Sequence, residues 1–162
     1  MPIRKNLAVH RDPYLPLMGP KETAVCRRCG ASYRRKRWSM EKPLDLMKES
    51  GVRAVVCPAC RKVDDSFPGG IIRLGGAFLK PHRQEIIGLI RNEEARAKMI
   101  NPLERVILIK DEGNVVEVQT TSDRFAQRIG MEIHRAYKGE VTYHWSRDDK
   151  FIRVTWHRGQ ER

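Results

Sequence analysis

The 162-residue sequence has no long apolar run and no segment typical of secretion. Uncharged stretches such as residues 67–72 and 74–79 are far too short to cross a bilayer, which takes about 20 apolar residues. No apolar segment with a small-residue cleavage site follows Met1, so we expect a cytoplasmic protein with no membrane partner. The glycines and prolines follow no fixed period, which excludes collagen-like and solenoid architectures.

The sequence also lacks a catalytic constellation. It contains no HExxH or GxSxG motif, and its five histidines have no acidic or nucleophilic neighbour at motif spacing. The double glycines at 69–70 and 75–76 are not followed by the Gly-Lys-Ser/Thr of a phosphate-binding loop, so we expect them to mark sharp turns. We therefore predict that the protein is not an enzyme.

Acidic residues are scarce in the first quarter of the chain. The whole sequence has a formal net charge of +12, from 32 Lys and Arg against 20 Asp and Glu. Residues 1–42 hold 11 basic and 3 acidic residues, whereas residues 103–162 hold 11 and 10. Because a cationic segment of this kind attracts polyanions, we predict RNA or DNA as the partner of the N-terminal segment.

The four cysteines fall in two tight pairs with none left over. Each pair can form a knuckle that directs two thiolates at one point: Cys26-Arg27-Arg28-Cys29-Gly30 and Cys57-Pro58-Ala59-Cys60. Glycine permits the positive φ of such a turn and proline fixes φ, which favours both knuckles. Two knuckles place four sulfurs at about 2.3 Å from a tetrahedral Zn²⁺. We predict one structural zinc ion in a closed site, with no position for an activated water, held by Cys26, Cys29, Cys57 and Cys60.

Two other interpretations of the cysteines remain open. Disulfide bonds would need an oxidising compartment, which the missing signal peptide disfavours. The order CxxCG followed by CPxC also resembles rubredoxin, a one-iron electron carrier, so iron is the alternative metal. The segment between the two pairs is rich in Arg and Lys here, whereas rubredoxins are acidic.

A run of four cations followed by an aromatic residue lies between the knuckles. Arginine and lysine neutralise phosphates and release counterions, while an aromatic ring can stack on an unpaired base. A solvated hairpin with its tryptophan packed beside the metal is the competing interpretation. The predicted nucleic-acid-binding residues are Arg4, Lys5, Arg11, Arg27, Arg28, Tyr33, Arg34, Arg35, Lys36, Arg37 and Trp38.

The pattern along the chain predicts an α+β fold in four parts. These are a basic extended tail over 1–22, a four-cysteine zinc ribbon over 23–79, a long connecting helix over 80–102 and a ββαββ module with an antiparallel sheet over 103–158. Helices are predicted over Pro43–Ser50, His82–Ile100 and Arg124–Lys138, the last capped by Thr121-Ser122-Asp123. Strands are predicted over Val52–Val56, Val106–Ile109, Val115–Thr120, 141–145 and 152–156.

One face of the ββαββ sheet is expected to lie opposite the helix. It carries Thr142, His144, Arg153, Thr155 and His157, because these alternate with the apolar residues of their strands. Such a face is either a second RNA-binding surface or one solvated face of an antiparallel sheet.

The order of these elements resembles a family of small prokaryotic zinc-ribbon proteins. It resembles, more distantly, the nonsense-mediated-decay-three family, whose eukaryotic members are export adaptors of the large ribosomal subunit. The paired cysteines carry the resemblance together with residues 115–141, VVEVQTTSDRFAQRIGMEIHRAYKGEV, and residues 151–158, FIRVTWHR. Within them, Ala126-Gln127-Arg128 and Gly139-Glu140-Val141 match the helix and the following strand start of that family's module. The resemblance implies binding near the transfer-RNA sites of the large subunit.

We therefore predict a non-enzymatic, zinc-dependent RNA-binding protein that associates with the ribosome. The role expected for it is in assembly, silencing or quality control. Three alternatives come from other classes of protein. They are a DNA-binding zinc ribbon, a rubredoxin-like iron electron carrier and a protein-interaction adaptor.

Overall fold

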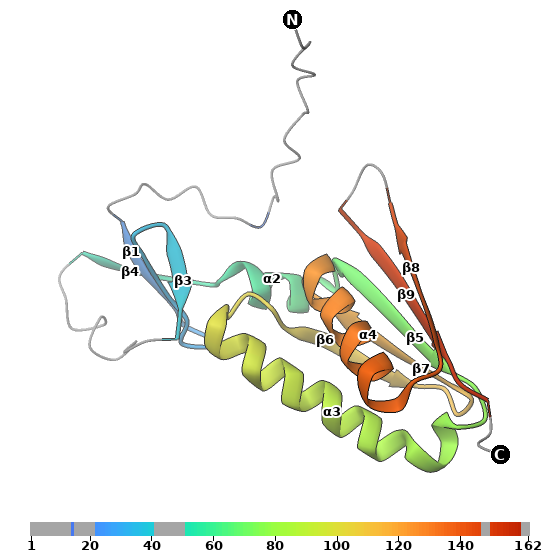
Figure 1. Ribbon diagram of the computed structural model, residues 1–162. Helices are drawn as coiled ribbons and strands as arrows, with labels where there is room; N and C mark the ends of the chain where they lie inside the picture. The colour runs from blue at the N-terminus through green and yellow to red at the C-terminus, as the bar shows by residue number, and fades with distance from the viewer. Residues whose placement is uncertain (1–13, 15–21, 41–50, 147–149, 160–162) are drawn as a thin grey trace, which may run out of the picture.

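Two β-sheets of different size lie at opposite ends of the molecule in Figure 1. This computed structural model describes residues 14, 22–40, 51–146 and 150–159. The predicted helix over Pro43–Ser50 and most of the N-terminal tail therefore lie outside the described residues. No helix within those ranges is both long enough and apolar enough to cross a membrane.

The smaller sheet belongs to the N-terminal ribbon and has the strand order β3-β2-β1-β4. Its strands are β1 (Thr23–Cys26), β2 (Ser32–Arg34), β3 (Arg37–Ser39) and β4 (Val52–Val55). Strands β2 and β3 form a hairpin, while β4 pairs with β1 in parallel and brings the second cysteine pair beside the first. The chain then continues into helix α2 (Pro58–Asp65).

The larger sheet has five strands in the order β6-β7-β5-β9-β8. Its strands are β5 (Gly70–Gly75), β6 (Val106–Asp111), β7 (Val115–Thr120), β8 (Glu140–Trp145) and β9 (Ile152–His157). Helices α3 (Leu79–Ile100) and α4 (Asp123–Tyr137) both cover one face of this sheet (Figure 1). The buried core between the two layers comprises Ile72, Leu74, Leu79, Ile86, Ile90, Val116, Val118, Phe125, Ile129, Ile133, Ile152, Val154 and Trp156, among others.

Strand β5 corrects the expected architecture of the second domain. It lies in the centre of the sheet, antiparallel to β7 and parallel to β9, so the sheet is mixed and has five strands rather than the four of a ββαββ module. The boundary expected at residue 79 therefore falls after a strand that belongs to the second sheet. The glycines that predicted sharp turns lie at the two ends of this strand, with Gly70 and Gly75 inside it. Gly70 lets α4 approach, since a Cβ there would lie 2.4 Å from the Cβ of Ala126.

Helix α3 packs on this sheet as part of its helical layer, which corrects its expected role as a connecting helix. Ile86, Ile90 and Ala97 are buried in the same core as the strands. Ile100, the last residue of the helix, is 72% exposed.

Helix α4 begins where the sequence predicted. The hydroxyl of Ser122 accepts a hydrogen bond of 3.1 Å from the backbone N–H of Phe125, which caps the helix. Gly130 faces the sheet from the middle of α4, and a Cβ at this position would lie 2.7 Å from Cγ1 of Val154. The helix and the sheet therefore approach one another more closely than an alanine would allow.

Gly130→Ala is expected to destabilise the protein by about 1–3 kcal/mol, because the new methyl group overpacks the helix–sheet contact. Alanine is normally the better helix former, so the sign of the effect is the informative result. Gly88→Ala in α3 is the matched control, since a Cβ there meets nothing within 4 Å. It should stabilise the protein by about 0.5–1 kcal/mol in urea unfolding. Equal effects of the two substitutions would contradict the close packing at Gly130.

Candidate metal centre

The two cysteine pairs lie on different local structures. Cys26 ends β1 and Cys29 follows in a turn, where Gly30 has a φ of +80° as expected for this knuckle. Cys57 caps α2, and its sulfur accepts a hydrogen bond of 3.4 Å from the backbone N–H of Cys60. Pro58 occupies the first turn of that helix, where its fixed φ suits the start of a helix. The sequence predicted the second knuckle but not the helix that it begins.

The four sulfurs form one compact cluster. All lie within 4.8 Å of one another, with 3.8 Å between the Sγ atoms of Cys26 and Cys60 and 3.6 Å between those of Cys29 and Cys57. A tetrahedron with metal–sulfur bonds of about 2.3 Å has sulfur–sulfur edges of about 3.8 Å, so the four ligands fit one metal ion. The separations are far above the roughly 2.05 Å of a disulfide, and all four cysteines are free.

Polar groups surround the sulfur cluster. The backbone N–H of Cys57 donates to the Sγ of Cys26 at 3.2 Å, and a guanidinium N–H of Arg105 donates to the Sγ of Cys60 at 3.5 Å. Four thiolates around a divalent ion carry a net charge of −2. These donors stabilise that charge in a site where three of the four cysteines are buried.

The thiols of the cluster shift one another's pKa values. A hydrogen bond from Cys57 lowers the pKa of Cys29 to about 4, and the same hydrogen bond, together with burial, raises the pKa of Cys57. Burial also raises the pKa of Cys60. A cation bound at the cluster would displace the protons that the raised pKa values favour on Cys57 and Cys60.

Trp38 lies in the core of the ribbon. It is 6% exposed and packs in the same cluster as the cysteines, with its ring centroid 5.4 Å from that of Tyr33. Tyr33 and Trp38 are cross-strand partners in the β2–β3 hairpin. An indole held in this core is not available to stack on a base, which corrects the expectation that Trp38 binds nucleic acid directly.

The cations of the hairpin are exposed at its tip. Arg34 and Arg37 are paired across the two strands, and Arg35 and Lys36 form the two-residue turn between them, with φ values of 52° and 64°. No ion pair involves any of these four side chains within the part of the chain that the structure describes. They form the basic tip, a name used below for residues 34–37.

The other predicted nucleic-acid contacts are in different situations. Arg27 is exposed, whereas Arg28 forms an ion pair with Asp64 of α2, which raises the pKa of the guanidinium. The structure therefore brings Arg28 to an acidic side chain rather than leaving it free for phosphate. Arg4, Lys5 and Arg11 lie outside the described residues.

Two residues of the tail expected over 1–22 are described, Tyr14 and Glu22, and Tyr14 contacts α2. The hydroxyl of Tyr14 donates to Asp65 at 2.9 Å, and its ring centroid lies 5.3 Å from that of Phe67. The guanidinium carbon of Arg61 lies 5.4 Å from the centroid of the Tyr14 ring. This contact was not predicted from the sequence.

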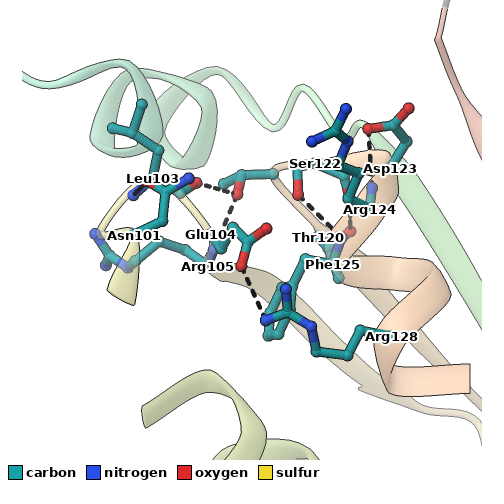
Figure 2. A network of polar contacts seen from close by, with 11 residues as sticks. Asn101, Leu103, Glu104, Arg105, Thr120, Ser122, Asp123, Arg124, Phe125 and Arg128 are labelled. Atoms are coloured by element: carbon teal, nitrogen blue, oxygen red, sulfur yellow. Dashed lines mark hydrogen bonds and ion pairs between the residues drawn. The ribbon is translucent and has the colours of Figure 1, made fainter. Parts of the chain in front are cut away.

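The loop between α3 and β6 is hydrogen-bonded to the turn before α4 and to α4 itself (Figure 2). Leu103 packs against the cysteine cluster, while its carbonyl accepts a hydrogen bond of 2.6 Å from the hydroxyl of Thr121. That hydroxyl also accepts a hydrogen bond of 2.9 Å from the backbone N–H of Arg105. Glu104 is buried in the same loop and accepts from Arg128 of α4 at 3.1 Å. Arg105 thus contacts Cys60 on one side and the start of α4 through Thr121 on the other.

Comparison of the chain with protein-family models, with curated proteins and with solved structures returned no match. The resemblance to the nonsense-mediated-decay-three family accordingly stays a prediction. Function is inferred below from the geometry of the chain itself.

Removing the metal with a strong chelator is expected to unfold the ribbon and leave the larger sheet folded. The backbone N–H groups of Cys26, Arg27 and Gly30 are hydrogen-bonded within the knuckle and to β4. Their hydrogen exchange should accelerate on the order of 100-fold or more, because the metal supplies most of the folding free energy of such sites. The amide of Ile72 in β5 is the internal control and should be unaffected. Unchanged exchange at the knuckle would show that no metal stabilises it.

Proposed function

We propose that the protein is a non-enzymatic, zinc-dependent RNA-binding protein that associates with the ribosome. The observation that carries the proposal is the basic tip, where four exposed cations have no acidic partner among the described residues. A cluster of this kind binds phosphate groups by releasing their counterions.

The backbone of the turn supports a functional role for its cations. Two-residue hairpin turns with both central residues at positive φ favour Asn-Gly, because other side chains are strained there. Arg35 and Lys36 occupy those two positions instead. Positive charge is thus present where an uncharged pair would relieve strain, as expected if the tip contacts a polyanion.

The metal centre supports the same role by fixing the direction of the tip. Trp38 lies one residue beyond the basic tip and is packed among the cysteines, and Tyr33 precedes the tip on the opposite strand. A rigid hairpin loses little conformational entropy when its side chains bind, which favours affinity. All four metal ligands come from the protein, so the role proposed for the metal is structural.

Zinc is the proposed metal, with iron as the alternative. The purified protein should be colourless and contain one zinc per chain by elemental analysis, because Zn²⁺ has a filled d shell and is the usual ion of closed four-cysteine sites. A coloured protein containing stoichiometric iron would instead favour the rubredoxin-like interpretation.

The basic tip can be tested without disturbing its turn. The variant Arg34→Ala/Arg35→Asn/Lys36→Gly/Arg37→Ala removes four charges and installs a turn sequence that suits the observed backbone. Its binding to total ribosomal RNA should weaken, and the slope of log K against log salt should fall by about 3, because each lost phosphate contact removes about 0.7–0.9. Fluorescence anisotropy over a salt series measures both quantities.

The matched control removes the same charge from the helical layer. The control variant changes four exposed cations of α3 and α4: Lys80→Ala/Arg91→Ala/Arg96→Ala/Arg135→Ala. Its affinity for ribosomal RNA and its slope of log K against log salt should match the parent's, apart from the small general effect of the lower net charge. On a sucrose gradient of native lysate, the parent and this control should sediment with large ribosomal subunits, and the tip variant should remain at the top. Co-sedimentation of the tip variant with ribosomes would refute the proposed site, and a preference of the parent for duplex DNA would favour the DNA-binding alternative.

A further inference from the structure

The two outer strands of the larger sheet differ in how their edges are protected. Strand β6 has a register irregularity between Val106 and Leu108, and the backbone N–H of Val106 donates to the carboxylate of Glu94 at 2.5 Å. Bulges and capped N–H groups of this kind prevent a sheet edge from pairing further. Strand β8 runs in continuous register with β9 over six residues and contains no proline or lysine. Its outer edge therefore lacks the usual protection and is paired with no other described strand.

The hydrogen-bonding phase of β8 shows which groups face outward. At the end of the β8–β9 hairpin, the N–H of Ser146 donates to the carbonyl of Phe151 at 2.8 Å. Because hydrogen-bonded pairs alternate in an antiparallel ladder, every second residue of β8 from Ser146 bonds to β9. The backbone groups of Val141, Tyr143 and Trp145 consequently point to the open edge and can accept another strand.

The side chains of β8 are complementary to a second copy of the same strand. If two β8 strands pair antiparallel about a twofold axis at Thr142, the outward groups of Val141 and Tyr143 of the two copies face one another. In this register, Glu140 of each copy lies opposite His144 of the other, and the two Thr142 residues face each other. Acid–imidazole and Thr–Thr pairs across strands both stabilise a sheet. All three side chains are exposed on the open face of the sheet.

The distribution of charge also permits two copies to approach. The basic ribbon lies at the opposite end of the molecule from β8 (Figure 1). Residues 103–162, which contain β8, hold 11 basic and 10 acidic residues. Two copies joined at β8 would therefore keep their basic tips well beyond the screening length of about 8–10 Å at physiological salt.

The apolar side of β8 supplies a further contact. Trp145 is 43% exposed and Tyr143 is half-buried, on the side of the strand that faces the helices. In the register about Thr142, Trp145 lies opposite Gly139 of the other copy, which has no side chain to obstruct the indole. Aromatic side chains that are half-exposed at a sheet edge are typical of interfaces.

We propose that the protein forms a weak, symmetric homodimer by antiparallel pairing of two β8 strands, which extends the larger sheet to ten strands. The occupant of the open edge is thus a second copy of this chain. A contact made by one pair of short strands is typical of a dimer that forms and dissociates with concentration.

Sedimentation velocity of the full-length, metal-loaded protein over a range from about 5 to 500 µM tests the proposal. The parent should shift from monomer to dimer as the concentration rises. Thr142→Lys should weaken dimerisation at least tenfold, because it places two ammonium groups opposite each other at the twofold axis. Thr155→Lys is the matched control, since Thr155 is the cross-strand neighbour of Thr142 on β9 and is also exposed. It should dimerise like the parent, because its charges are separated by three strand spacings and screened by salt.

A charge exchange tests the register. Glu140→Lys should weaken the dimer roughly tenfold, since two favourable cross-strand pairs become unfavourable. The double variant Glu140→Lys/His144→Glu restores both pairs and should recover the parent's dissociation constant. Thermal melting of each variant confirms that the monomer is folded.

Four results would overturn the proposal. The first is a parent that stays monomeric at the highest concentration, which would leave the edge to an extended segment of another protein. The second is equal dimerisation of Thr142→Lys and Thr155→Lys. The third is loss of the dimer in Leu108→Lys, which changes an exposed residue of the other outer strand, β6. The fourth is a double variant that dimerises as weakly as Glu140→Lys.

Discussion

The pairing of β5 with β7 on one side and β9 on the other is the constraint on which the larger domain depends. This pairing joins residues near position 70 to residues near position 155, so the centre of the sheet forms through contacts between residues that are distant in sequence. Both helices pack on the same face of this sheet. The opposite face and the β8 edge remain exposed as a direct result of that arrangement (Figure 1).

The ribbon depends on a different interaction, the convergence of four sulfurs from two separate local structures. Parallel pairing of β1 and β4 sets the distance between the knuckles, and α2 begins at the second of them. The loop after α3 then connects this centre to the rest of the molecule through Leu103 and Arg105. The orientation of the basic tip relative to the sheet thus follows from contacts made around the metal centre.

The features that the sequence predicted are those encoded by local spacing. The cysteine knuckles, the strands with alternating apolar residues and the Ser122 cap are confirmed, because each is specified within a few residues. Strand β5 was missed because its glycines are typical of turns, and its two neighbours in the sheet lie far along the chain. The burial of Trp38 could not be decided from sequence alone, since an aromatic residue beside cations suits both a core and a stacking surface.

The parallel pairing of β5 with β9 has a consequence for synthesis of the chain. All four sulfur ligands have been translated by residue 60, whereas the central strand of the larger sheet lacks one neighbour until residue 152 and beyond have left the exit tunnel. The four ligands of the candidate metal centre are thus available while the nascent chain is still growing. Strand β9 then completes the larger sheet. Premature termination before β9 would therefore release a chain that has all four cysteine ligands but whose strand β5 lacks a neighbour, which would leave apolar core residues of the sheet exposed.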